Sequence, residues 1–517
     1  MKIIYIPLDD RPCNVDYPQW IARLQPSIEL LVPPIAILGR KKQPAIVDEL
    51  WHWLESVICP DTIVILSIEM LVYGGLVPSR LHYLPLSTLQ DRLQKIRQLV
   101  LRYPTLNILA SNLIMRCPTY NSSEEEPDYY AQWGADLFRW GWLNDRGQRS
   151  LLTDQERSEK DALNTILPES ILRDYCDRRE KNLTVNQSVI ELVQQGIIQF
   201  LSIPQDDAAP YGFTAMDQGV IFAKIQSDRL ADSIHLYPGA DEVGCTLLAR
   251  AYLMGHTDLK SGILKFYPLY ANSQAETLIP RYEDRPLRQS IDAHIRAVGG
   301  ELVSDVGAAD IILALNTPGS VMQESWEQDQ KDSTYSTQRD LSAFVTQIKD
   351  FLTQEKTIAF ADIAFSNGGE TECIQCLDRA GILDRLLAYG GWNTCCNSLG
   401  TVLATATLAW RSEQTAEITF NLIYHLLEDW LYQAIVRQEL VQQYLPSLGV
   451  SYYDFGDQNE TIARETEQRL RHYWQALILH SFRAWHIHSL EIDHPWGRMF
   501  EIGMHLKLRL GLSTLST

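Results

Sequence analysis

Residues 62–68 read TIVILSI, and residues 86–102 read LSTLQDRLQKIRQLVLR. The first stretch is a short apolar run that ends at the carboxylate Glu69, which is typical of a buried strand. The second stretch repeats leucine and isoleucine at three- and four-residue spacing, which is typical of an amphipathic helix. Strands that alternate with helices along a chain predict an α/β fold with a parallel sheet.

The same alternation extends in both directions along the first half of the chain. Runs with strand character occupy residues 3–8, 29–32, 62–68, 106–111, 198–203 and 233–237. A closed barrel needs eight strands in roughly 250 residues. The segment 116–164 is long enough to hold the missing strands or an insertion. We therefore predict a TIM-barrel-like (β/α) N-terminal domain over residues 1–257.

The remainder predicts two further regions. A smaller Rossmann-like or flavodoxin-like domain is expected over 258–412, and a helical C-terminal region over 413–517. The predicted strands of the smaller domain are 262–267, 301–304, 310–315 and 357–362, and its predicted helices include 287–298 and 341–352. The polar stretch 323–339 predicts an exposed loop. The predicted C-terminal helices span 417–444 and 461–486.

Composition narrows the possible partners. The 517 residues include 45 basic and 65 acidic ones, so the net charge is −20 and the chain repels nucleic acid and anionic membranes. No apolar run approaches the roughly 20 residues that span a bilayer, and the start MKIIYIPLDD turns acidic before a signal-like region develops. Nine scattered cysteines suit a reducing compartment. We expect a cytoplasmic protein.

One pair of acids stands out among the polar clusters. Asp206 and Asp207 lie in PQDDAAPYG, directly after the strand predicted at 198–203. In a loop, both carboxyls can reach one cavity, and their proximity raises the apparent pKa of the second ionisation. A protonated carboxyl beside an ionised one is suited to general acid catalysis at neutral pH. We expect Asp206 and Asp207 to be the catalytic residues.

Other polar side chains follow the predicted strands and are expected to share the pocket, because loops at the carboxyl ends of parallel strands share one edge. The predicted substrate-binding residues are Asp9, Asp10, Arg11, Asn14, Glu69, Tyr73, Arg80, Arg116, Arg179, Asn182, Tyr211, Asp241, Glu242, Trp392 and Asn393. Structural alternatives stay open: Asp10 and Arg11 can form a local ion pair, the arginines can neutralise nearby acids, and Trp392 and Asn393 can brace a seam between domains.

Glycoside hydrolysis fits this inventory, because its usual form needs two carboxylates and polar or aromatic groups for the sugar. We expect a hydrolase of a glycoside or related sugar derivative, with a small-molecule or oligosaccharide substrate and no cofactor. An adjacent Asp pair favours a substrate-assisted route on an N-acetyl sugar, in which one Asp orients the acetamido group and the other protonates the leaving oxygen.

Two alternatives remain. The same carboxylates could hold Mg²⁺ or Ca²⁺, which prefer oxygen ligands, in a metal-dependent hydrolase or isomerase. A non-catalytic sugar-binding protein is the third possibility. Zinc is not expected, since there is no HExxH motif. A P-loop, a G-x-S-x-G elbow and a G-x-G-x-x-G fingerprint are also missing from the sequence, which argues against the enzymes that use them.

Several motifs together carry a family resemblance. They are LDDRP at 8–12, YGGL at 73–76, PQDD at 204–207, PYG at 210–212, PGADEV at 238–243 and GGWNT at 390–394. This set resembles the bacterial family filed as domain of unknown function 4127, and the likeness spans almost the whole chain. The resemblance implies that the motifs belong together in one protein family. It brings no activity with it.

Overall fold

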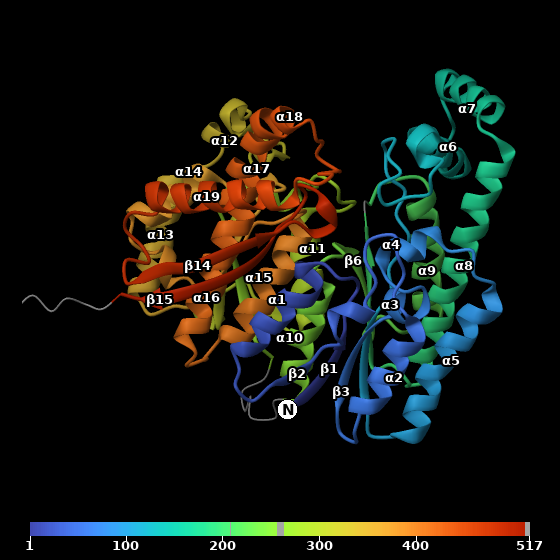
Figure 1. Cartoon of the computed structure of the whole chain (residues 1–517), viewed down its shortest axis with the longest axis horizontal. Coiled ribbons are helices and arrows are strands. Elements are labelled where there is room, and N and C mark those ends of the chain that lie inside the picture. Colours follow the sequence, from blue (N-terminus) through green and yellow to red (C-terminus); the bar gives the residue numbers. More distant parts are fainter. Residues whose placement is uncertain (207, 256–262, 512–517) are drawn as a thin grey trace, which may run out of the picture. The chain divides into compact units, whose positions relative to one another are not determined.

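The computed structural model describes residues 1–206, 208–255 and 263–511, so the predicted domain boundary at 257/258 lies outside them. Contacts divide the chain into two units. Unit 1 comprises Met1–Asp10, Ile28–Leu247 and Tyr282–Asp284. Unit 2 comprises Arg11–Ser27, Leu248–Arg281 and Arg285–Thr517. Each unit contains one large parallel sheet (Figure 1).

The sheet of unit 1 has six parallel strands, and all six strand predictions are confirmed. The strands are β1 (Lys2–Ile6), β2 (Glu29–Leu31), β3 (Ile63–Ser67), β4 (Asn107–Ser111), β5 (Phe200–Gln205) and β6 (Ile234–Pro238). Their order is β2-β1-β3-β4-β5-β6. Every residue of β3 is buried, as expected for a parallel strand covered on both faces.

The prediction of a TIM-barrel-like domain is wrong. Among the described residues, β2 and β6 each pair with one neighbour only, so the sheet is open. The segment between β4 and β5 supplies no further strands. It forms three helices instead, α6 (Tyr130–Arg149), α7 (Asp154–Ile166) and α8 (Glu169–Gln194). Six strands cannot complete the eight-stranded closure of such a barrel.

Helices connect the strands of unit 1. They include α2 (Val47–Val57), α3 (Ile68–Val72), α4 (Leu76–Leu81), α5 (Leu86–Arg102) and α9 (Phe213–Ser227). The predicted helix 86–102 is confirmed residue for residue by α5, whose apolar side chains at the expected spacing are buried. Helix α5 packs beside the long helix α8, and α6 and α7 lie at one end of α8 (Figure 1).

The sheet of unit 2 has five parallel strands in the order β13-β11-β9-β7-β8. They are β7 (Lys265–Tyr270), β8 (Glu301–Leu302), β9 (Ile311–Asn316), β11 (Ile358–Asp362) and β13 (Ala388–Gly390). Counted along the chain, this order reads 2-1-3-4-5, the arrangement of flavodoxin-like sheets. The predicted helices are present as α11 (Leu287–Val298) and α13 (Leu341–Thr353).

The predicted exposed loop at 323–339 is wrong in part. It contains the short strand β10 (Gln323–Glu324), a 3-10 turn and helix α12 (Thr334–Thr337). Tyr335 and Arg339 are buried. The Arg339 guanidinium is buried because it forms a two-bond ion pair with Glu370. Local polarity cannot reveal a partner that lies so far along the chain.

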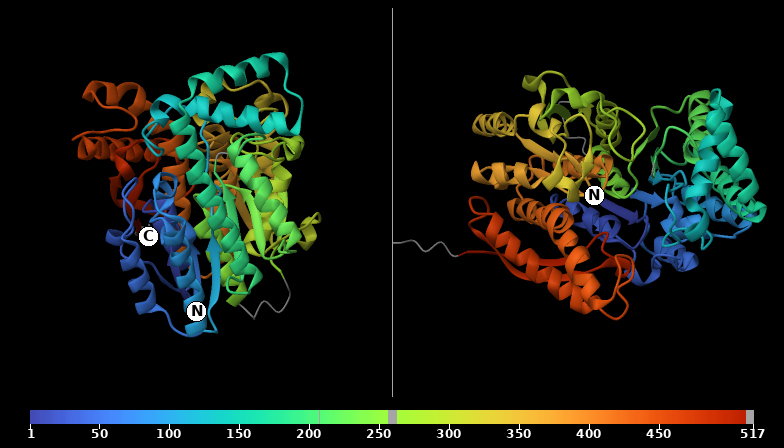
Figure 2. Two further views of the ribbon diagram at one scale, coloured as in Figure 1. Left: turned by 90° about the vertical axis from the view of Figure 1, so that its right-hand side faces the viewer. Right: turned by 90° about the horizontal axis from the view of Figure 1, so that it is seen from above.

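The C-terminal region is helical only in its first part. Helix α16 (Thr415–His425) continues into a π-helix, η6 (Leu426–Val436), and α19 (Asn459–Leu477) follows later. The predicted helix 461–486 extends too far, because β14 (Trp485–Asp493) pairs with β15 (Gly503–Leu510) in an antiparallel hairpin. Helix α19 packs against β14 (Figure 2). None of the helices that the structure describes is long and apolar enough to cross a membrane.

One glycine fixes the approach of the segment after β6 to β1. A Cβ at Gly244, in the first turn of α10 (Val243–Gly255), would lie 2.1 Å from the Tyr5 hydroxyl oxygen. Tyr5 is buried and cannot withdraw into solvent.

We predict that Gly244→Ala lowers the free energy of unfolding by about 1–3 kcal/mol through overpacking. The matched control is Gly219→Ala within α9, where nothing lies within 4 Å and Ala should stabilise the helix. Urea denaturation of both variants tests this, and equal stability of the two would contradict it.

Candidate functional site

Loops that follow four strands of unit 1 meet in one apolar cluster. Its members are Leu8, Leu76, Leu113 and Ala240, and all are buried. These residues come after β1, β3, β4 and β6 respectively. Because parallel strands end at one edge of a sheet, the motifs that contain these residues are brought to the same edge.

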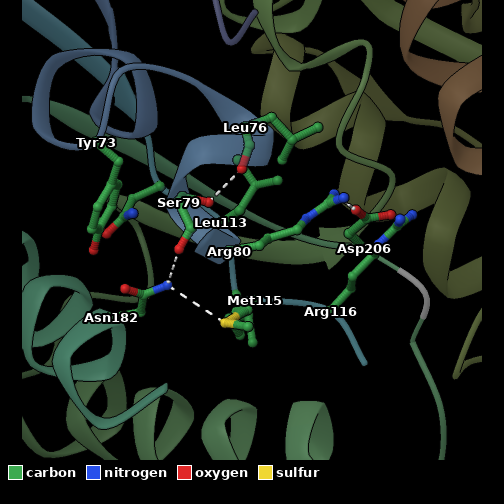
Figure 3. A pocket seen from close by; sticks show the side chains of 11 residues that line it. Tyr73, Leu76, Ser79, Arg80, Leu113, Met115, Arg116, Asn182 and Asp206 are labelled. Carbon is green, nitrogen blue, oxygen red and sulfur yellow. Dashed lines mark hydrogen bonds and ion pairs between the residues drawn. The ribbon is translucent and has the colours of Figure 1, made fainter. Parts of the chain in front are cut away.

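A small cavity lies at this edge. Its volume is about 10 Å³, which is room for about one water molecule. The lining residues are Tyr73, Leu76, Ser79, Arg80, Asn112, Leu113, Ile114, Met115, Arg116, Asn182 and Asp206. Figure 3 shows Arg80 and Arg116 reaching toward Asp206, while Asn182 lies with Ser79 and Met115 in another part of the wall.

Arg80 is the centre of a buried charge network, with its side chain 2% exposed. Its Nη2 lies 2.7 Å from Asp206 Oδ2, and its Nη1 lies 2.9 Å from Glu125 Oε2. Arg116 shares Glu125 with Arg80 and also binds Glu126, with Nη2 3.0 Å from Glu125 Oε2 and Nε 2.7 Å from Glu126 Oε1. Burial disfavours the charged guanidinium, but Glu125 and Glu126 outweigh it and raise the pKa of Arg116. Asp206 is thus held in place by its ion pair with Arg80.

Glu69 lies in a different environment, buried in the first turn of α3. Its Oε1 accepts hydrogen bonds from Asn112 Nδ2 (2.7 Å) and the Leu113 amide (2.8 Å). Its Oε2 has no hydrogen-bond partner within the described chain. Burial raises the pKa of Glu69 to about 7, against the opposing effect of the bonds from Leu113 and Asn112. This carboxyl can gain or lose a proton near neutral pH.

Strand register explains the position of Glu69. Ser67 pairs with Ser111 at the ends of β3 and β4. The Ser67 hydroxyl accepts a bond from the Met70 amide (3.3 Å) and caps α3, so the chain turns into a helix immediately after the strand. Glu69 and Asn112 then lie just beyond paired residues on neighbouring strands.

Two further predicted residues, Tyr73 and Asn182, line the cavity. Arg179 lies behind it and supports the wall. Its Nη2 forms an ion pair with Asp217 (2.6 Å) and donates to the Met115 carbonyl (2.8 Å). The alternative expectation for this arginine, neutralisation of a nearby acid, matches its contacts.

The acids after β1 and β6 do not line the cavity. Asp9 is buried, whereas Asp10 and Asp241 are partly exposed. Glu242 is buried and its Oε2 accepts a hydrogen bond from the Thr246 hydroxyl (2.5 Å). Burial, with a smaller contribution from Asp241, raises the pKa of Glu242 to about 8.

Tyr211 packs on α6 rather than in the cavity. Its ring meets Trp142 edge-on at 5.2 Å, and the Arg146 guanidinium lies 5.5 Å from its centre. Asp207, the second predicted catalytic acid, lies outside the described residues.

Four predicted residues belong to unit 2. Arg11 Nη1 lies 3.4 Å from Glu501 Oε2. Asn14 is buried in α1 (Pro12–Arg23). Trp392 is buried, with its ring 6.5 Å from Tyr17. Asn393 has a left-handed backbone with φ of 64°.

Unit 2 has a polar network of its own at the carboxyl edge of its sheet. Asp362, the last residue of β11, pairs in register with Asn316 of β9 and accepts a hydrogen bond from its amide (2.8 Å). Asp362 also accepts bonds from the Glu370 amide (2.8 Å) and the Tyr389 hydroxyl (3.2 Å). Burial, and then the charge of Glu370, raises the pKa of Asp362 to about 7.

A helix of rare type closes this network. In η6, Asp429 Oδ2 accepts a hydrogen bond from the Gly391 amide (2.9 Å), and its carbonyl accepts one from the Gly369 amide (2.8 Å). His425 Nδ1 lies 3.1 Å from both carboxylate oxygens of Asp429. Long π-helices are uncommon and often accompany functional sites. The network therefore fixes the loops after β11 and β13.

The metal alternative receives no support from these contacts. No group of three or more His, Cys, Asp or Glu side chains among the described residues is placed to hold a metal ion. The acids closest to the cavity bind arginines instead, as Asp206 and Glu125 do. Mg²⁺ and Ca²⁺ take several oxygen ligands, and Asp207, one of the acids of this alternative, lies outside the described residues.

Sequence reasoning missed Asn112, Glu125 and Glu126. Asn112 directly follows a predicted strand, so its position alone was a usable signal. Glu125 and Glu126 belong to an acidic run that follows Arg116 closely in the sequence. This proximity was a usable signal for an ion pair. Arg339 of unit 2 was missed because it lies in a stretch that is polar throughout.

The pKa of Glu69 predicts a pH-dependent stability. Its folded pKa of about 7 exceeds the ordinary 4.5, so the folded state binds more protons between these values. The contribution of Glu69 to the free energy of unfolding is therefore fully present below pH 4.5 and is lost as the pH rises through about 7. Glu69→Gln cannot show this loss, because glutamine does not titrate. The difference in free energy of unfolding, variant minus wild type, should therefore be larger at pH 8 than at pH 4.5 by on the order of 3 kcal/mol, at about 1.4 kcal/mol per pKa unit.

Denaturation midpoints at pH 4.5 and 8 measure this difference. The control is Glu49→Gln at an exposed position of α2. A Glu69→Gln variant whose stability follows that of wild type at every pH would contradict the assignment.

Comparison with known proteins places the chain in a family. No curated protein matches the chain. A family model described as a protein of unknown function, DUF4127, matches residues 3–505 of the 517. The match takes in the loops after every strand of both sheets, including those that carry Glu69, Arg80, Asp206 and Asp362. The resemblance carried by the sequence motifs is thereby confirmed, and the chain belongs to the DUF4127 family.

Proposed function

We propose that this protein is a hydrolase of a glycoside or related sugar derivative that works at the carboxyl edge of the unit 1 sheet. The observation that carries the proposal is the contrast between two carboxyls. Asp206 forms a 2.7 Å ion pair with Arg80. Glu69 is buried, and burial raises its pKa to about 7. One ionised carboxylate and one carboxyl protonated near neutral pH are the two groups that the usual glycoside hydrolysis needs.

The roles follow from these environments. Glu69 donates a proton to the leaving oxygen. Asp206, whose side chain is 23% exposed, presents its negative charge to the anomeric centre or to the attacking water. The cavity beside Asp206 holds about one water molecule. This division moves the acid role from the Asp206–Asp207 pair to Glu69.

Neighbouring groups suit a hydroxylated substrate. Asn182 and Tyr73 supply amide and hydroxyl groups in the cavity wall. Arg80 and Arg116 hold three carboxylates in fixed positions, which limits reorganisation when charge develops. For an N-acetyl sugar, the orienting role expected of one member of the Asp pair falls to Asp207 in this proposal.

Leaving-group dependence tests the role of Glu69. We predict that Glu69→Gln lowers kcat on an alkyl glycoside by about 10²–10⁴-fold, the usual contribution of general acid catalysis. On a dinitrophenyl glycoside the loss should be less than about tenfold, because that leaving group departs without a proton. Asp206→Asn should be slow on both substrates. Steady-state kinetics on a panel of aryl and alkyl glycosides measures these effects.

A matched control is Glu159→Gln on α7, which removes an ion pair with Arg139 outside the cavity wall. Its kinetics should equal those of wild type. If Glu69→Gln and Asp206→Asn hydrolyse every glycoside that wild type hydrolyses at unchanged rates, the proposal is wrong. Binding of sugars without turnover by wild type would favour the non-catalytic alternative instead.

A further inference from the structure

A second recess lies in unit 2, between α19 and β14. Its volume is about 290 Å³, close to the lower end of small-molecule pockets. The lining residues are Arg471, Trp474, Gln475, Ile478, Leu479, Ser481, Phe482, Arg483, Trp485, His486 and Ile487. All of them come from α19, from β14 or from the turn that joins the two. We call this recess the α19–β14 groove.

The side chains that line the groove carry no negative charge, although the Asp378 and Asp384 carboxylates accept hydrogen bonds from backbone amides of residues 479–482. The lining includes two arginines and a histidine but no carboxylate, in a protein of net charge −20. Arg471 is ion-paired with Glu467, with Nε 2.8 Å from Oε1. Arg483 is exposed and makes no ion pair with the described residues. An arginine of this kind is suited to a carboxylate or a phosphate.

Aromatic rings form the wall of the groove. Trp474 and Phe482 lie 5.7 Å apart at a tilt of 45° and are buried. Trp485, at the start of β14, is partly buried. Indole rings bind flat molecules by stacking and tolerate many ring types.

Ser481 supplies a third, independent feature. The residue is 3% exposed, and its hydroxyl oxygen has no hydrogen-bond partner among the described residues. Its backbone amide is already used, since it donates to Asp378 Oδ1 at 2.8 Å. A buried hydroxyl without a partner is costly, so a ligand that bonds to it gains affinity.

We propose that the α19–β14 groove binds a planar ring that carries a phosphate or a carboxylate. The ring stacks on the partly exposed Trp485, the anionic group pairs with Arg483, and a polar atom of the ligand bonds to the Ser481 hydroxyl. The site is separate from the glycoside site of unit 1, because every lining residue belongs to unit 2. It therefore stands or fails independently of the proposed function.

Titration calorimetry on the full chain at low salt tests the proposal. The probes are adenosine monophosphate, indole-3-acetate, adenosine and inorganic phosphate. We expect one or both of the first two probes to bind at least tenfold more tightly than adenosine or phosphate alone. Preference for the nucleotide would assign the anion as phosphate, and preference for indole-3-acetate would assign it as carboxylate. Binding should weaken as salt rises, because the contact with Arg483 is exposed.

Variants locate the binding. Arg483→Glu should weaken binding at least tenfold, and Ser481→Ala severalfold, with unchanged melting temperature for Arg483→Glu. The control is Arg464→Glu, an exposed arginine of α19 outside the groove, which should bind as wild type does. The proposal is overturned if neither ring-bearing anion binds, if phosphate alone binds as well as they do, or if Arg483→Glu leaves their affinity unchanged.

Discussion

Parallel pairing of the strands is the constraint on which the other features of this protein depend. In each large sheet every strand runs in the same direction, so all carboxyl ends reach one edge. Residues that follow different strands thereby become neighbours, as Glu69 and Asn112 do in unit 1. The same constraint places Asn316 beside Asp362 in unit 2. The topology of each sheet thus determines which polar residues become neighbours at its carboxyl edge.

Such an edge brings polar groups together away from water. The chain must then provide hydrogen-bond or ion-pair partners for them. Arg80 and Arg116 do this for Glu125, Glu126 and Asp206. Removal of one member of a buried ion pair leaves its partner charged and unpaired. This lowers the free energy of unfolding by about 3–5 kcal/mol. The arginines of the cavity wall therefore hold these acids in place. This accounts for the abundance of arginine at an edge that the sequence suggested was mainly acidic.

Sequence patterns predicted the elements of this fold better than their assembly. Strand and helix periodicity located all six strands of unit 1 and the exact span of α5. Whether the sheet closes depends on how many strands the segment after β4 contributes. That segment forms three helices, and its local sequence did not indicate whether the sheet is open or closed. Long-range ion pairs were equally hidden. Nothing near Arg339 in sequence indicates its pairing with Glu370, and the predicted shared pocket does not specify that Arg80 pairs with Asp206.

The two buried acids with a pKa of about 7 are a useful contrast. In Asp362 both carboxylate oxygens accept hydrogen bonds, from Asn316 on one side and from Glu370 and Tyr389 on the other. The fixed backbone there leaves no room for change, since a Cβ at Gly369 would lie 2.2 Å from the Tyr389 hydroxyl oxygen. Glu69 has one oxygen held by two donors and one without a partner. Asp362 therefore holds the loops around it through bonds to both of its oxygens, whereas Glu69 keeps one buried oxygen without a partner among the described residues. Two acids with the same pKa thus differ in hydrogen-bond saturation, and the proposed acid role of Glu69 rests on that difference.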